Sequence, residues 1–72
     1  MTNTQLLRNR IEESGYKISY IAAKLGITYQ GLSKKINNET EFKASEIKIL
    51  YNLLSLDDAD REAIFFAQDV DI

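Results

Sequence analysis

The stretch from Ile18 to Ile36, I-S-Y-I-A-A-K-L-G-I-T-Y-Q-G-L-S-K-K-I, decides the fold of this chain. Apolar residues recur at helical spacing on both sides of Gly26, which predicts two short helices joined by a tight turn. We expect Ala22, a small residue, where the two helices cross closely. The expected apolar anchors of the pair are Ile21, Leu25, Ile27, Leu32 and Ile36. Such a pair can hold its second helix outward, so function is sought there first.

The composition narrows the class of protein. The chain has 72 residues, which we interpret as one domain spanning 1–72, near the lower limit for a single hydrophobic core. It contains no cysteine and no histidine, so disulfides, thiolate metal sites and the commonest general base are missing. No apolar run approaches the roughly 20 residues of a membrane span. We therefore expect a soluble intracellular protein with no membrane association, no metal and no cofactor.

The breakers are few, which favours an all-α fold with short connections. There is no proline, and only three glycines occur. Apolar spacing predicts a compact five-helix domain whose second and third helices form the pair described above. The five expected helices span about residues 4–14, 18–25, 29–37, 44–54 and 58–68.

Capping residues support these boundaries. Gly15 suits the end of the first helix, and Thr28 is a good N-cap for the third. Ser55 with Asp58 three residues later resembles a capping box at the start of the fifth helix. Phe42 lies in the loop between the third and fourth helices, and we expect it to plug the core from there.

Charge is distributed unevenly along the chain. Residues 1–48 carry eight Lys or Arg and five acids, which gives +3, whereas residues 49–72 carry one Arg and six acids, which gives −5. The sum is the net charge of −2. The acidic part includes the expected C-terminal helix and tail, about residues 57–72. The half with the helix pair is suited to face phosphate, although ordinary solvated surface also explains single charges.

The chain resembles the Cro/repressor type of helix-turn-helix regulators, often called XRE-like, over about residues 5–56. The resemblance rests on Ile21-Ala22, Leu25-Gly26-Ile27, Leu32-Ser33, Asn37-Asn38, and Phe42 with Ser45-Glu46-Ile47 and Leu50. The segment 61–67, R-E-A-I-F-F-A, extends the likeness to small switch regulators of temperate phages, of the modulator-of-repression kind. The resemblance implies a non-enzymatic transcriptional regulator of a lysis–lysogeny switch, acting on double-stranded operator DNA in the cytoplasm of a bacterial host.

The resemblance also implies which residues touch DNA. Gln30 fits a bidentate bond to adenine, and Tyr29 fits a thymine methyl group or a phosphate. Lysines here would neutralise phosphates. The residues that fall at base-edge or phosphate positions are Lys17, Thr28, Tyr29, Gln30, Ser33, Lys34, Lys35 and Asn38. Each also has a plainer interpretation, since Gln30 and Ser33 suit any exposed helix, Tyr29 could cover the turn and Lys35 could be a solvated lysine.

Two features oppose tight binding of DNA by a single copy. Glu39 and Glu41 follow the third helix, where carboxylates would repel phosphates. Gly31 lies inside that helix, where glycine costs about 1 kcal/mol relative to alanine. Gly31 is explained either by close approach to a partner or by simple tolerance. A homodimer that binds two half-sites is one solution, and a ligand other than DNA is the alternative.

The alternative function is an anti-repressor that docks on a partner phage repressor and binds little DNA itself. Glu39 and Glu41 could pair with the basic DNA-reading face of that repressor, and Phe66 could anchor the contact. Adjacent helical residues point about 100° apart, so Phe65 and Phe66 cannot both face a small core fully. We expect Ile64 or Phe65 to be buried and Phe66 to be partly exposed, with Ala67 and Gln68 outside; burial of both phenylalanines against the first helix is the alternative.

An enzyme is not expected. Catalysis without histidine or cysteine would need paired carboxylates or a lysine in a cleft. Asp57, Asp58 and Asp60 lie close together, but acids at a helix start are favoured by the helix dipole. They also lack the glycine and terminal glutamate of a calcium loop.

Overall fold

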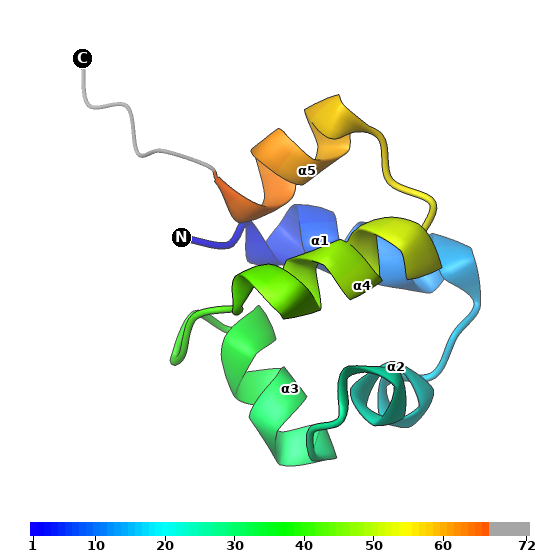
Figure 1. Ribbon diagram of the computed structural model, residues 1–72, viewed down its shortest axis with the longest axis vertical. Helices are drawn as coiled ribbons and strands as arrows, with labels where there is room; N and C mark the ends of the chain where they lie inside the picture. Colours follow the sequence, from blue (N-terminus) through cyan, green and yellow to red (C-terminus); the bar gives the residue numbers. More distant parts are fainter. Residues whose placement is uncertain (67–72) are drawn as a thin grey trace.

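The computed structural model describes residues 1–66, which form five α-helices and no strand. The helices are α1 (Thr4–Ser14), α2 (Ile18–Leu25), α3 (Tyr29–Ile36), α4 (Ala44–Leu53) and α5 (Asp58–Phe65) (Figure 1). The predicted all-α, five-helix architecture is confirmed. The bounds of α1 and α2 match the expected ones, and α3 and α4 each end one residue earlier. The expected continuation of α5 to residue 68, with Ala67 and Gln68, lies outside the described residues.

Local capping explains where most helices begin and end. The side chain of Asn3 accepts a hydrogen bond from the Leu6 amide (3.1 Å) at the start of α1. Gly15 ends α1 with φ 76°, as expected for a residue in the left-handed region. The Lys43 amide donates to Glu46 Oε1 (2.7 Å) at the start of α4, which holds that carboxylate against the helix N-terminus.

The predicted cap of α5 is wrong in its residues. Asp57 rather than Ser55 caps this helix: its carboxylate accepts from the Asp60 amide (2.7 Å), and the Asp60 carboxylate accepts from the Asp57 amide (3.2 Å). Ser55 instead adopts φ 54° and ends α4. Its amide and that of Leu56 donate back to carbonyls of the last turn. Ser55 therefore lies two residues before the residue that caps α5.

The core draws a side chain from every helix. The largest fully buried side chains are Leu7, Ile21, Leu32, Ile36, Leu50 and Ile64. Phe42 packs against this cluster from the loop, and its ring meets that of Phe65 edge-on with centroids 5.4 Å apart. Phe65 is 5% exposed and Phe66 51%, so the predicted division between them is confirmed. All the expected anchors of the α2–α3 pair are buried except Ile27, which is half-buried.

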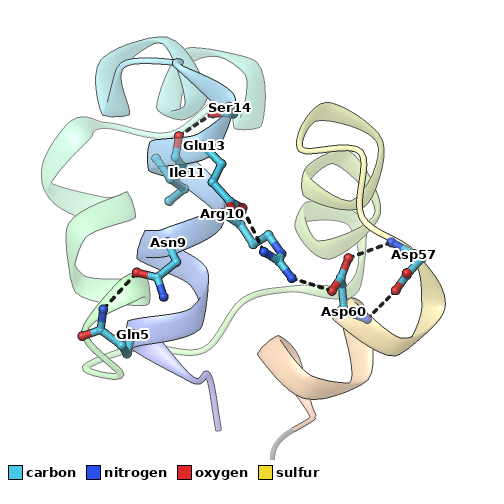
Figure 2. A network of polar contacts seen from close by, with 8 residues as sticks. All are labelled: Gln5, Asn9, Arg10, Ile11, Glu13, Ser14, Asp57 and Asp60. Carbon is cyan, nitrogen blue, oxygen red and sulfur yellow. Dashed lines mark hydrogen bonds and ion pairs between the residues drawn. The ribbon is translucent and has the colours of Figure 1, made fainter.

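Polar contacts tie α5 to α1 (Figure 2). Arg10 on α1 donates to Asp60 Oδ1 on α5 (3.0 Å) and to Glu13 Oε1 (2.8 Å). The Arg10 hydrogen bond, helped by the Asp57 amide, lowers the pKa of the Asp60 carboxyl. The Asn3 amide also donates to the Ile64 carbonyl (2.6 Å).

In Figure 1, α5 lies at one end of the long axis and the α2–α3 pair at the other. No helix in residues 1–66 is long and apolar enough to cross a membrane.

Candidate functional site

A tight turn sets the angle between α2 and α3. Gly26 has φ 71° and ψ 27°, so the predicted left-handed turn is confirmed. The Gly26 amide donates to the Ala23 carbonyl (3.1 Å) and the Ile27 amide to the Ala22 carbonyl (3.0 Å), a pair of bonds typical of a helix end. Ala22 is buried, which allows the expected close packing of the pair.

Thr28 fixes the first turn of α3. Its hydroxyl oxygen accepts a hydrogen bond from the Gly31 amide (2.9 Å), so the predicted N-cap is confirmed. A Cβ at position 31 would lie 3.1 Å from that same oxygen. Glycine at position 31 therefore leaves room for the cap, a reason that neither sequence-based interpretation of Gly31 contained.

The two faces of α3 differ sharply. Leu32 and Ile36 are each 1% exposed and fasten the helix to the core. Tyr29 is 58% exposed, Gln30 and Lys34 are exposed, and Ser33 is half-buried. We call Tyr29, Gln30, Ser33 and Lys34 the outer face of α3.

The side chains of the outer face are available to a ligand. Within residues 1–66, the side-chain hydrogen bonds of this region involve Thr28, Lys35, Asn37 and Asn38. None of them uses the phenol of Tyr29, the amide of Gln30 or the ammonium of Lys34. On the outer face, the amide of Gln30 can therefore both donate and accept a hydrogen bond, and the ammonium of Lys34 can donate, without breaking a side-chain hydrogen bond within residues 1–66.

Positive charge is concentrated around this face. Residues 14–38 contain four lysines and no acidic residue, the lysines being Lys17, Lys24, Lys34 and Lys35. Lys17 is exposed directly before α2, and Lys34 is in the last turn of α3, where a cation is favoured by the helix dipole. The surface formed by α2 and α3 is therefore basic, although the whole chain carries a net charge of −2.

A row of aromatic and basic side chains on α2 and directly before it was not predicted. The rings of Tyr16 and Tyr20 stack with centroids 5.0 Å apart, and Lys24 Nζ lies 5.4 Å from the centroid of the Tyr20 ring. Both tyrosines are exposed. Tyr20 and Lys24 are four residues apart on α2, a spacing that marks one exposed helical face, whereas Tyr16 precedes the helix and no helical spacing indicates its stacking on Tyr20.

Lys35 is committed to the fold rather than to the outer face. Its side chain is 13% exposed and its ammonium lies 3.0 Å from Glu46 Oε1, with the Glu41 carbonyl at 2.9 Å. Burial raises the pKa of the Glu46 carboxyl, but the hydrogen bonds from the Lys43 amide and Lys35 outweigh it, so this pKa lies below its ordinary value. Lys35 therefore joins α3 to α4 and is neither a free phosphate contact nor a solvated lysine.

Asn38 is also engaged internally. Its backbone has φ 65°, which asparagine tolerates better than most residues. Its side chain accepts from the Thr2 amide (2.8 Å) and donates to the Thr2 carbonyl (2.7 Å). These bonds fasten the N-terminal segment to the end of α3, so the amide of Asn38 is not available to a phosphate without breaking them.

The residues considered for a protein partner lie in the loop after α3 and directly after α5. Glu39 and Glu41 are exposed in the loop after α3. Phe66 lies directly after α5, beside the hollow between α4 and α5, and it lines a second, smaller hollow together with Glu41. The structure therefore does not gather these three side chains with the outer face of α3 into one site.

The described part of the chain contains no candidate metal site that could be considered beside the outer face of α3. Among residues 1–66, no group of three or more acidic side chains is placed to hold a metal ion.

Comparison with known protein families, with curated proteins and with solved structures finds no match to this chain. The outer face of α3 and its basic surroundings are thus the candidate site on physical grounds alone.

Proposed function

We propose that this chain is a non-enzymatic transcriptional regulator in which α2 and α3 form a helix-turn-helix and the outer face of α3 binds double-stranded DNA. The observation that carries the proposal is the two-sided character of α3. On one side, Leu32 and Ile36 are buried and fasten the helix to the core. On the other side, Gln30 and Lys34 are exposed, and their amide and ammonium groups make no side-chain hydrogen bond within residues 1–66. A rigid short helix with an outward amide and ammonium is suited to the major groove.

The charge distribution supports the same ligand. The acid-free stretch 14–38 places Lys17 and Lys34 on the surface that a groove-bound helix would turn towards phosphates. The acidic side chains of α5 lie at the other end of the molecule, where they would not oppose binding (Figure 1). The resemblance of the sequence to phage switch regulators suggests operator sites of a lysis–lysogeny switch as the natural target.

Selection from random DNA tests the proposal and finds the operator sequence at the same time. The full chain would be used to select duplexes from a random-sequence DNA pool, and binding of the enriched duplex would be measured by fluorescence anisotropy at several salt concentrations. We expect one enriched sequence and binding that weakens as salt increases. The absence of any enrichment, together with no binding at low salt, would rule the proposal out.

A second function is favoured by one specific observation. Glu39 and Glu41 are exposed at the end of α3, where two carboxylates disfavour phosphate. An anti-repressor would use them to pair with the basic DNA-reading face of a partner phage repressor. Its test is co-elution of this chain with a phage repressor, should one be encoded beside it, and a Glu39→Lys, Glu41→Lys double variant should then lose the complex.

A further inference from the structure

The hollow between α4 and α5 has a volume of about 780 Å³, within the range typical of sites for small molecules. Its apolar lining includes three aromatic rings, those of Phe42, Tyr51 and Phe66. Phe66 is 51% exposed, so its ring is open to a ligand rather than packed in the core. None of the lining residues belongs to α2 or α3, and the hollow is therefore separate from the outer face of α3. A flat apolar ring suits this lining, because aromatic rings pack well against each other in offset or edge-on arrangements.

The hollow also holds two cations in an otherwise acidic part of the chain. Arg61 is the only basic residue among residues 49–72, which contain six acids, and Lys48 directly precedes that stretch. Both side chains line the hollow. Among residues 1–66, Glu62 is the one acidic residue in the same lining. The charged lining is therefore net positive, which favours an anionic ligand.

The guanidinium of Arg61 lacks a close anionic partner within residues 1–66. Its Nη2 approaches Asp58 Oδ1 only to 3.9 Å, and that oxygen already accepts a hydrogen bond from the Tyr51 hydroxyl (3.0 Å). The Nε of Arg61 is buried and makes no hydrogen bond with these residues. The guanidinium lies over the Tyr51 ring, with Cζ 5.5 Å from the ring centroid, which holds it beside the hollow. Lys48 is exposed and takes part in no ion pair within residues 1–66.

We propose that the hollow between α4 and α5 binds a small aromatic carboxylate. The ring of the ligand packs against Tyr51 and Phe66, and its carboxylate binds Arg61 and Lys48. An arginine held by a neighbouring ring is suited to this role, because a carboxylate matches the planar guanidinium with two parallel hydrogen bonds. The site does not depend on DNA binding, so its test uses no DNA and its failure leaves the proposed function untouched.

The test compares two probes of the same shape, β-naphthoate and its neutral amide, β-naphthamide. Titration of the isotope-labelled full chain, followed by NMR, gives the dissociation constant of each probe and the backbone amides whose signals shift. We expect β-naphthoate to bind about 10-fold or more tightly than β-naphthamide, because hydrogen bonds between charged groups are stronger than those to a neutral amide. The shifts should be concentrated on α4 and α5.

Substitutions in the lining separate charge from apolar packing. Arg61→Gln should weaken β-naphthoate about 10-fold and leave β-naphthamide nearly unchanged. Lys48→Gln should weaken β-naphthoate about 3-fold, and Glu62→Gln should strengthen it about 2-fold, as expected for exposed charges. Lys24→Gln is the matched control: Lys24 also lies over a tyrosine ring (5.4 Å) but is outside the hollow, so both dissociation constants should stay the same.

Circular dichroism checks that each variant remains folded, and Lys48→Gln decides the outcome if Arg61→Gln does not fold. Equal affinity for the two probes overturns the proposal, because the hollow is then only an apolar surface of the kind that a partner protein covers. The proposal is also overturned if neither probe binds or if the shifts fall on α2 and α3. A preference for the carboxylate that survives both Arg61→Gln and Lys48→Gln excludes the two cations as its cause and overturns it too.

Discussion

The side chain of Gln30 offers the sharpest residue-level test of base recognition. Gln30 is exposed on α3 and its side-chain amide makes no hydrogen bond within residues 1–66, so Gln30→Ala removes no internal side-chain hydrogen bond and should leave the melting temperature nearly unchanged. If its amide makes a bidentate bond to a base, the variant should lose about 1–3 kcal/mol of binding free energy on the selected duplex. The loss should be concentrated at one base pair. Equal binding by Gln30→Ala and the original chain would exclude this contact.

Lys34 should act on all DNA sequences alike. An ammonium that neutralises a phosphate contributes through counterion release, which carries no sequence information. Lys34→Ala should therefore weaken specific and non-specific binding together and reduce the slope of log K against log salt by about 1. The control is Lys48→Ala on α4, outside the α2–α3 surface, which should leave that slope unchanged. A steeper slope for Lys34→Ala would contradict phosphate contact by this residue.

The sequence pattern predicts the structural role of a residue well only where the atoms that it contacts are nearby in the chain. The roles of Gly26 and Thr28 depend on atoms within four residues, and both were predicted correctly. The side chain of Asn38 bonds to Thr2, which is 36 residues away, so no local pattern could show that it is engaged. Only Ser55 was predicted as the cap of α5, and the left-handed turn at Ser55 that ends α4 leaves the role to Asp57.

At the scale of elements, the ion pair of Lys35 and Glu46 connects α3 to α4. The two side chains are 13% and 6% exposed, so removing one partner leaves a poorly solvated charge. Glu46→Ala should therefore reduce the free energy of unfolding by about 3 kcal/mol, measured by urea denaturation. It also removes the carboxylate that accepts from the Lys43 amide.

A paired substitution separates the charge from the packing. Replacing both residues together, as Lys35→Met with Glu46→Leu, removes the two charges while keeping apolar volume, and should recover most of the lost stability. If the double variant is no more stable than Glu46→Ala, the ion pair is not what joins the two helices. The folded double variant should still bind the selected duplex, because Lys35 lies away from the outer face of α3.

The sequence predicts which side of each helix is buried better than it predicts the surfaces that two helices form together. Periodic apolar residues fixed which side of α3 turns inwards, because burying Leu32 and Ile36 leaves Gln30 and Lys34 outside. The hollow between α4 and α5 depends on how two helices separated by a loop pack together: its α4 residues recur at helical spacing, from Ala44 to Asn52, but that spacing does not show which part of α5 lies opposite them. The same limit applies to the Arg10–Asp60 bond, which joins positions 50 residues apart.

At the scale of the whole molecule, two depressed carboxyl pKa values predict acid sensitivity. Asp60 and Glu46 have ordinary values of 3.8 and 4.5, and both lie lower in the folded chain. The unfolded chain therefore binds more protons in acid, and the free energy of unfolding should fall as the pH drops below about 4.5. Because the chain has no histidine, stability should be nearly constant between about pH 6 and 8.

Thermal unfolding followed by circular dichroism across this pH range measures the effect. Asp60→Asn removes one of the two carboxyls, so it should be less stable than the original chain at neutral pH and should lose less stability on acidification. Asp58→Asn is the matched control: Asp58 is also in the first turn of α5 but is largely exposed and accepts a hydrogen bond from the Tyr51 hydroxyl (3.0 Å) rather than from Arg10, a bond that an amide oxygen can still accept. Stability that increases towards acid would show that neither Asp60 nor Glu46 is stabilised as the anion by the contacts described for α1, α3 and α5.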